Sequence, residues 1–351
     1  MTGRLHKEIC DFYDFVKPQH FEQTVRQELL SRLQSIVVKE IPNASVMCFG
    51  SFAAGMYLPN ADMDVVIVSN SYRTTGLKVI CQSRNQLGRF SDFVRSSNLG
   101  TSVETIASAK VPLVKFIDRL TGIRVDVSFE NDTGILANGT FANWKRQYPA
   151  MPVLVTVIKQ FLMMRGLNEV VHGGLGGFSV TCLVTSLLQN MPRVQSGDLV
   201  PEQHLGEILI EFLDFYGNQL DTSRTGIMMQ PPGYFEKVRN SDFDKRAPVN
   251  LNQRNKYRPN QPNRSTYQAP KADRLAIMDP NQEYNDISGG SRLVMFIFER
   301  FSYAHKEILQ AMKTPGRISL LDWSLGGNYD SFTYQRNRLR ELYGERKSVP
   351  E

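Results

Sequence analysis

The sequence has few cysteines, no long apolar segment and no paired metal-ligand motif. Its four cysteines stand far apart without a CxxC pair, and its five histidines form no ligand spacing with them. We therefore expect free thiols, as in a reducing compartment, and no structural zinc in this chain. No apolar run approaches the ~20 residues that cross a bilayer, and residues 1–21 lack the apolar core of a signal peptide. Neither a membrane protein nor a disulfide-stabilised secreted protein is expected.

Positive charge is in modest excess. The chain has 41 Lys and Arg against 35 Asp and Glu, and a net charge of +6. This is compatible with a nucleic-acid partner but does not require one. Residues 245–271 carry seven basic residues and no acidic one, within an Asn- and Pro-rich insertion at 229–272. We interpret this basic arm as a mobile insertion; contact with RNA phosphates is the alternative.

The hydrophobic pattern divides the chain into two parts. The first part reads as a small mixed sheet with helices, and the second, from about residue 148, as mostly helical. Together they predict an α+β protein of two domains. Strands are predicted at 44–49, 62–69, 102–109, 111–117 and 124–129, and helices at 21–41, 83–96, 152–165, 178–189 and 205–216.

Two acidic residues open the second predicted strand. Asp62 and Asp64 are two positions apart, so their side chains project from one face of a strand. Adjacent carboxylates repel each other, and such a pair is typical of a divalent-cation site. The preceding Gly50-Ser51 turn offers backbone N–H groups and a hydroxyl to a phosphate. The combination indicates nucleotide chemistry.

A third carboxylate, Asp126, lies between apolar residues on another predicted strand. A buried acid needs a partner, and the Asp62/Asp64 pair with its metal ions would complete a two-metal phosphoryl-transfer site. Taken alone, an Asp in a strand is more often a surface residue, so the case for Asp126 depends on joining it to the pair.

Seven segments in this order resemble the nuclear poly(A) polymerases that form the catalytic subunit of TRAMP-type RNA surveillance complexes, within the DNA polymerase beta-like nucleotidyltransferase superfamily. They cover nearly the whole chain apart from the insertion and the C-terminal end. The segments are Phe49-Gly50-Ser51, Tyr57-Leu58-Pro59-Asn60-Ala61-Asp62-Met63-Asp64, Val125-Asp126-Val127-Ser128-Phe129, and residues 157–162, 173–179, 210–217 and 277–288.

The resemblance implies a polymerase beta-like nucleotidyltransferase domain at 21–147 and a helical central domain at 1–20 and 148–335. It implies an active site in the cleft between them and a nucleotide-recognition segment at 277–292. Asp62, Asp64 and Asp126 would be the catalytic residues and would bind two Mg²⁺ or Mn²⁺ ions. The implied nucleotide-binding residues are Gly50, Ser51, Lys159, Gly177, Phe178, Ser179, Tyr216, Asn285 and Asp286.

Two of these nucleotide-binding residues also have an alternative interpretation without a role in nucleotide binding. Lys159 would face the triphosphate, or it is a solvated helix lysine. Tyr216 would stack on the base, or it is a core tyrosine at a helix end. The recognition segment also departs from the family pattern, because Asp286 and Gly289 replace Asn and Arg. An ionised Asp only accepts hydrogen bonds, so the base preference is less firmly predicted than the reaction.

The resemblance implies a template-independent RNA 3′-adenylyltransferase that uses ATP and marks nuclear RNAs for the exosome. It further implies a zinc-knuckle RNA-binding partner, an RNA helicase, and location in the nucleus, including the nucleolus. Three alternatives remain: a terminal transferase with another or mixed base preference, a DNA-extending polymerase, and a catalytically silent scaffold for RNA decay.

Overall fold

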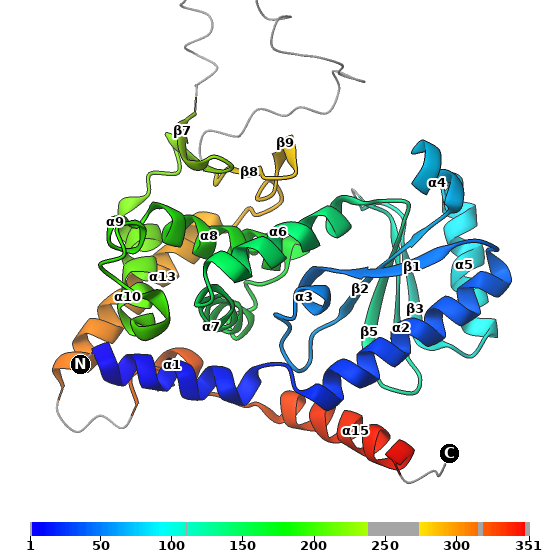
Figure 1. Ribbon diagram of the computed structural model, residues 1–351, viewed down its shortest axis with the longest axis horizontal. Coiled ribbons are helices and arrows are strands. Elements are labelled where there is room, and N and C mark those ends of the chain that lie inside the picture. The colour runs from blue at the N-terminus through cyan, green and yellow to red at the C-terminus, as the bar shows by residue number, and fades with distance from the viewer. Residues whose placement is uncertain (1, 110, 238–273, 315–318, 348–351) are drawn as a thin grey trace, which may run out of the picture. The chain divides into compact units, whose positions relative to one another are not determined.

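The computed structural model describes residues 2–109, 111–237, 274–314 and 319–347 (Figure 1). The chain divides into two compact units by its internal contacts: residues 1–9 with 148–325, here called the helical unit, and residues 10–147 with 326–351, here called the sheet unit. This grouping places residues 10–20 and 326–335 with the sheet unit, whereas the sequence analysis assigned them to the helical domain. The predicted basic arm at 245–271 lies outside the described residues.

The sheet unit is built on a five-stranded sheet in the order β1-β2-β5-β4-β3. Strands β2 and β5 pair in parallel, and the other neighbours pair antiparallel. The predicted strands are confirmed, with shifted ends for the third and fourth. The bounds are β1 (Ser45–Phe49), β2 (Met63–Val68), β3 (Gly100–Ile106), β4 (Leu113–Asp118) and β5 (Arg124–Phe129).

Two predicted helices, now bounded as α2 (His20–Glu40) and α5 (Arg84–Ser96), share one core with this sheet. Leu29 and Leu33 of α2 are four residues apart, so they lie on one helix face and are buried with Val65 and Val127 of the central strands. Among the described helices that lie wholly in the sheet unit, α6 (Thr133–Gln147), α15 (Asp330–Lys347) and the short α4 (Asn70–Thr75) were not predicted from the sequence. The four-residue α3 (Gly50–Ala53) connects β1 to the loop before β2.

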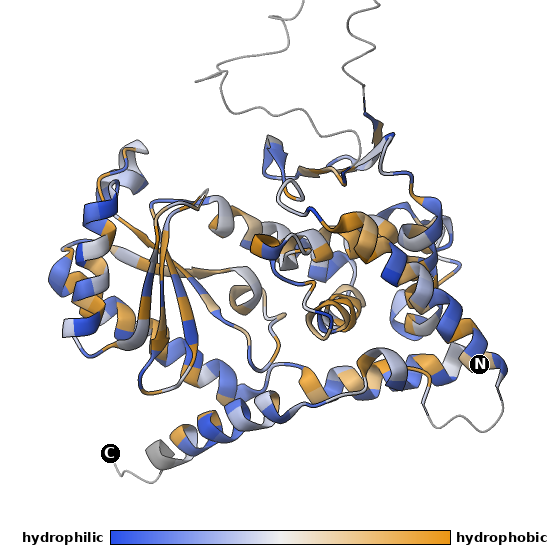
Figure 2. Ribbon diagram, turned by 180° about the vertical axis from the view of Figure 1, so that it is seen from behind, coloured by the Kyte–Doolittle hydropathy of each residue, from blue (hydrophilic) through white to orange (hydrophobic). Residues whose placement is uncertain are grey.

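The helical unit is centred on α7 (Met151–Met163) and α8 (Gly177–Asn190), both close to their predicted ranges. Figure 2 shows both as predominantly hydrophobic, in keeping with their almost complete burial. The predicted helix 205–216 ends earlier, as α10 (Leu205–Asp214), and continues as a π-helical turn, η3 (Phe215–Gln219). The long α13 (Val294–Lys313) was not predicted. The remaining elements are η1 (Val170–His172), α9 (Pro192–Gln195), η2 (Pro201–Gln203) and α14 (Asp322–Leu325).

A second sheet, in the order β7-β6-β8-β9, was missed by the sequence analysis. Its strands are β6 (Thr225–Met229), β7 (Pro232–Glu236), β8 (Ile277–Asp279) and β9 (Gln282–Asp286). The strands are short, and β6 pairs in parallel with β8, although residues 238–273 stand between them in the sequence. Strand β7 occupies residues that the sequence analysis assigned to the insertion, while β8 and β9 carry the recognition segment.

The N-terminal helix α1 (Thr2–Val16) contributes Leu5 and Ile9, both fully buried. Among the helices of the described residues, none combines the length and apolar character needed to span a membrane.

Candidate active site

The parallel pairing of β2 with β5 places two of the three predicted acids next to each other. Asp64 and Asp126 are register partners in this pair, and neighbouring strands lie about 4.8 Å apart. Asp62 immediately precedes Met63, the first residue of β2. Because side chains alternate along an extended chain, Asp62 and Asp64 share a face. The fold therefore gathers the predicted acids at one end of the central strand pair.

Two basic side chains lie against these acids. Lys115 of β4 is the register partner of Asp126 on the other side of β5, and its Nζ lies 2.6 Å from Asp126 Oδ2. Arg124, at the start of β5, donates from Nε to Asp62 Oδ1 at 2.5 Å. Neither residue was predicted from the sequence, although Arg124 stands two positions before Asp126 and Lys115 lies within a largely apolar strand. Their positive charges offset the repulsion between the carboxylates.

Burial raises the pKa of the Asp126 carboxyl above its ordinary value. The hydrogen bond and the charge of Lys115 act in the opposite direction, and the negative charge of Asp62 adds to the increase. Asp62 and Asp126 are thus close enough to interact electrostatically. The pKa is raised overall because the effect of burial is larger than the opposing effect of Lys115.

Gly50 is required by the position of Asp64. Its φ of +68° lies in the left-handed region, and a Cβ built on it would lie 2.3 Å from Asp64 Oδ2. No residue with a side chain fits there without moving the carboxylate. Ser51 follows as the second residue of α3. The predicted Gly50-Ser51 turn is therefore next to the acids, while its contact with phosphate remains a prediction.

The predicted metal site depends on the carboxylate oxygens of Asp62, Asp64 and Asp126. Three carboxylates supply the oxygen ligands that Mg²⁺ and Mn²⁺ prefer. In the described part of the chain, however, no three His, Cys, Asp or Glu side chains are grouped so that they would hold a metal ion as they stand. Asp62 is paired with Arg124 and Asp126 with Lys115. The residues fit a divalent cation in chemistry and strand register, provided that these carboxylates exchange their basic partners for it.

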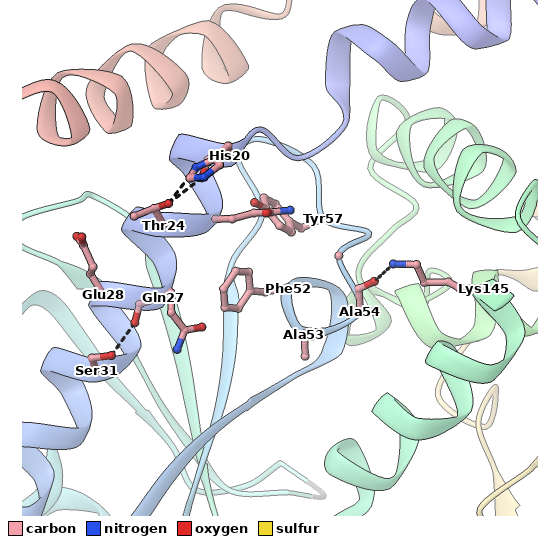
Figure 3. Close-up of a pocket in the computed structure, with 12 residues that line it drawn as sticks. His20, Thr24, Gln27, Glu28, Ser31, Phe52, Ala53, Ala54, Tyr57 and Lys145 are labelled. Atoms are coloured by element: carbon pink, nitrogen blue, oxygen red, sulfur yellow. Dashed lines mark hydrogen bonds between the residues drawn. The ribbon is translucent and has the colours of Figure 1, made fainter. Parts of the chain in front are cut away.

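An open groove of the sheet unit, with a volume of about 590 Å³, lies between α2, α3 and Lys145. Figure 3 shows Phe52 beside Gln27 of α2 and Tyr57 nearer to the His20 end of that helix, with Lys145 donating to the Ala54 carbonyl. None of the three acids lines this groove. It is a feature separate from the predicted catalytic residues.

In the helical unit, Lys159 and Gly177 lie side by side. A Cβ built on Gly177 would be 3.7 Å from the Lys159 ammonium nitrogen, so this cation sits at the N-terminal end of α8. A lysine and a helix N-terminus are both positive and do not favour each other. This position is compatible with the predicted contact between Lys159 and a triphosphate, which stays a prediction beside the alternative of a solvated lysine. The adjoining Phe178 is half-buried.

Ser179 connects α8 with the recognition segment. It is buried, and its hydroxyl lies 3.5 Å from the carbonyl oxygen of Ile287. The structure thus brings together Lys159, Gly177 and Ser179 with the end of the β8–β9 hairpin. All of these residues belong to the helical unit.

The two recognition-segment residues differ in what their side chains do. Asp286 Oδ1 accepts hydrogen bonds from the backbone N–H groups of Ile277 and Ser288 and from the Ser288 hydroxyl. Oδ1 therefore stabilises the hairpin, and the predicted contact of Asp286 with a base stays a prediction. Asn285 Nδ2 donates to Asp279 Oδ2 at 2.8 Å, and the predicted contact of Asn285 with a base likewise stays a prediction.

Tyr216 is a core residue, the second of the two alternatives. Its side chain is 1% exposed, and its hydroxyl donates to the Leu183 carbonyl at 2.7 Å. The ring packs against Phe212, Phe215 and Phe298. A base could not stack on it without unpacking this cluster, so the structure does not support the predicted stacking role.

Residues 5–145 match the model of the central palm domain of "Poly(A) RNA polymerase, mitochondrial-like", and residues 204–285 match "Cid1 family poly A polymerase". The chain resembles a solved structure of the polymerase core of TRAMP, a RNA surveillance complex. The identity is 30%, the TM-score 0.73, and the match covers 95% of this chain and 94% of that chain.

Two curated relatives are each 34% identical. Poly(A) RNA polymerase cid14 of Schizosaccharomyces pombe matches 85% of this chain, which spans 39% of that protein. The inactive non-canonical poly(A) RNA polymerase protein Trf4-2 of Drosophila melanogaster matches 67% of this chain, which spans 56% of that protein. The matched part of this chain thus spans well under two thirds of the length of either relative.

Proposed function

The chain belongs to the TRAMP-type poly(A) RNA polymerases of the nucleotidyltransferase superfamily, and we propose that it is a template-independent RNA 3′-adenylyltransferase. Family membership implies a nucleotide substrate and a divalent metal in general terms. The proposal adds ATP as the nucleotide, Mg²⁺ or Mn²⁺ as the metal and the RNA 3′-hydroxyl as the acceptor. The observation that carries it is the pairing of Asp64 with Asp126 in register, with Gly50 fitted against Asp64.

In the proposed reaction the 3′-oxygen of RNA bonds to the α-phosphorus of ATP. The bond between the α-phosphorus and its bridging oxygen breaks, pyrophosphate leaves, and the hydroxyl proton passes to solvent. Asp62, Asp64 and Asp126 would hold the divalent cations, which when bound neutralise charge on the phosphoryl oxygens and favour the ionised 3′-oxygen.

The remaining side chains bind and orient the nucleotide. Lys159 would pair with the triphosphate as a point charge, aided by the N-terminal end of α8. Asn285 can both donate and accept hydrogen bonds, which suits the edge of adenine. The Nδ2 group of Asn285 donates to Asp279, which fixes the orientation of the Asn285 amide. A fixed amide discriminates between bases better than a rotating one.

We further propose the biological setting that the TRAMP resemblance suggests. The substrates would be nuclear RNAs marked by oligo(A) for the exosome. A zinc-knuckle RNA-binding protein and a helicase would supply the RNA grip. The nucleus, including the nucleolus, would be the location. What supports these proposals is the 30% identity to the TRAMP polymerase core; isolating the native complex with its bound RNA would test them.

The scaffold alternative has one observation behind it, since the Drosophila relative is described as inactive. The experiment that separates the two uses labelled single-stranded RNA with a free 3′-hydroxyl, Mg²⁺ and each nucleoside triphosphate separately. A ladder with ATP supports the proposal, and a ladder with another nucleotide moves the base assignment. No ladder with any nucleotide, alone or with a zinc-knuckle partner, would favour the scaffold.

A further inference from the structure

The loop that leads into β2 is held by two arginines. Arg26 Nη2 donates to the carbonyl oxygens of Pro59 at 3.3 Å and Ala61 at 3.0 Å. Arg124 Nη2 donates to the intervening carbonyl of Asn60 at 3.2 Å. Three consecutive carbonyl groups just before Asp62 are therefore each bound by a guanidinium, so the backbone that carries Asp62 has little freedom.

Arg26 is the unusual member of this pair because it is completely buried. Its side chain is 0% exposed, whereas that of Arg124 is 60% exposed. Its guanidinium carbon lies 4.6 Å from the centre of the Tyr57 ring, and Tyr57, also buried, begins the same loop and lines the groove in Figure 3. Arg26 thus contacts the loop by stacking at its start and by hydrogen bonding near its end.

Burying a cation in this way is costly. Within the described residues, no carboxylate lies within salt-bridge distance of Arg26, and its Nε and Nη1 atoms have no hydrogen-bond partner. The acid one helical turn earlier, Glu22, pairs instead with Arg336. A buried charge without an ion-pair partner contributes poorly to stability, and an apolar side chain of similar size would be the more stable choice. Its hydrogen bonds to the loop carbonyls are therefore the best account of why an arginine stands here.

We propose that Arg26 is a positioning residue that fixes the Tyr57–Ala61 backbone and thereby sets where Asp62 stands relative to Asp64 and Asp126. The inference rests on the proposed function, since it assigns a task to the loop only if these acids do the chemistry. Asp62 precedes β2 and lacks the ladder hydrogen bonds that fix Asp64 and Asp126 within their strands. The loop must therefore hold Asp62 in its position. Displacement of a catalytic group by about 1 Å can reduce the rate about 10²-fold.

Arg26→Met tests the proposal, with Arg32→Met as the matched control. Arg32 is on the same helix and pairs with the buried Asp118 at 2.5 Å, away from the loop. Arg32→Met leaves the buried Asp118 without its ion-pair partner and should lower the melting temperature, whereas Arg26→Met removes a buried charge that has no ion-pair partner and should lower it less. Only Arg26→Met should lower kcat for RNA extension, by about 10- to 100-fold, with KM for ATP changed less than threefold, when each variant is assayed 15 °C below its own melting temperature.

Arg26→Lys keeps the charge but cannot reach both carbonyls in the arginine's geometry, and it serves if Arg26→Met does not fold. Mn²⁺ binding, followed by electron paramagnetic resonance, provides a readout besides activity. We expect the Kd for Mn²⁺ to rise at least fivefold in the Arg26 variants and to stay within twofold in Arg32→Met.

Equal kcat in the Arg26 and Arg32 variants, with unchanged Mn²⁺ affinity, would overturn the positioning role. A wild-type chain that extends no RNA, alone or with a zinc-knuckle partner, would instead contradict the proposed function, and the Mn²⁺ comparison would still decide the role of Arg26.

Discussion

The contact between Gly50 and Asp64 gives the sharpest prediction, because the same substitution at a second glycine isolates its two effects. Gly50 and Gly76 are both in the sheet unit and have nearly equal φ values of +68° and +72°. A Cβ at Gly50 would lie 2.3 Å from Asp64 Oδ2, while a Cβ at Gly76 would meet nothing within 4 Å. Alanine therefore strains the backbone at both positions but displaces a carboxylate only at Gly50.

The expected magnitudes follow from this difference. The left-handed conformation costs a residue with a side chain about 1–2 kcal/mol, which corresponds to a fall in melting temperature of roughly 2–8 °C for a unit of this size. Gly76→Ala should show that loss and no more. Gly50→Ala should show at least that loss, and its rate of RNA extension should fall more than about 100-fold because Asp64 has to move.

The assay is primer extension with ATP under single-turnover conditions, together with thermal unfolding of both variants. Each variant is assayed well below its melting temperature, so that unfolding does not contribute to the rate. If Gly50→Ala extended RNA as fast as Gly76→Ala, Asp64 would not need its observed position, and the reasoning from the Gly50 contact would be refuted.

Three further predictions concern other residues of the two candidate sites. Because burial raises the pKa of Asp126, the ionised carboxylate destabilises the folded state at high pH, whereas the protonated form at low pH does not. Asp126→Asn should therefore have a higher melting temperature than wild type near pH 8. A difference in melting temperature that persisted at pH 3 would contradict this explanation. Lys159→Met should raise KM for ATP about 10-fold or more through loss of a charged hydrogen bond, as measured against the exposed control Lys313→Met; equal KM values would support the solvated-lysine alternative. Asp286→Ala should lower stability by about 2–3 kcal/mol, since it leaves backbone donors unpaired, yet keep the ratio of ATP to UTP use, whereas Asn285→Ala should change that ratio; the opposite pattern would return base recognition to Asp286.

The central strands and the acids they carry were predictable because their signals are local. Val65 to Val68 form an apolar run bounded by polar residues, and the acids interrupt an otherwise buried pattern at Asp64 and Asp126. Burial on both faces of β2 and β5 produces that pattern directly. Their register pairing follows from the parallel arrangement, which the sequence alone does not specify.

The parts that were missed depend on contacts between distant residues. Strand β8 has three residues and pairs in parallel with β6 across roughly 50 positions, so it has no periodic signal of its own. Asp286 serves the hairpin only because its turn brings two backbone N–H groups to Oδ1. Tyr216 could be placed on a surface or in the core from its helix position, and the surrounding aromatic cluster decided the matter.

Arg26 illustrates a residue whose role the sequence hides. It stands in an amphipathic helix, where an arginine is ordinarily exposed, and its four-residue spacing from Glu22 resembles a simple surface ion pair. The structure buries both residues and gives each a different partner. Only the fold shows that this arginine meets the loop before Asp62.

The most direct test of the whole account compares two RNAs that differ only at the 3′ end, one with a 3′-hydroxyl and one with a 3′-deoxy terminus. Each is incubated with ATP and Mg²⁺, and the wild-type chain is compared with Asp64→Asn. The account predicts that only the hydroxyl-ended RNA is extended, that one pyrophosphate is released per adenylate added, and that Asp64→Asn does neither. Extension by Asp64→Asn, or pyrophosphate release that is independent of the RNA 3′ end, would contradict it.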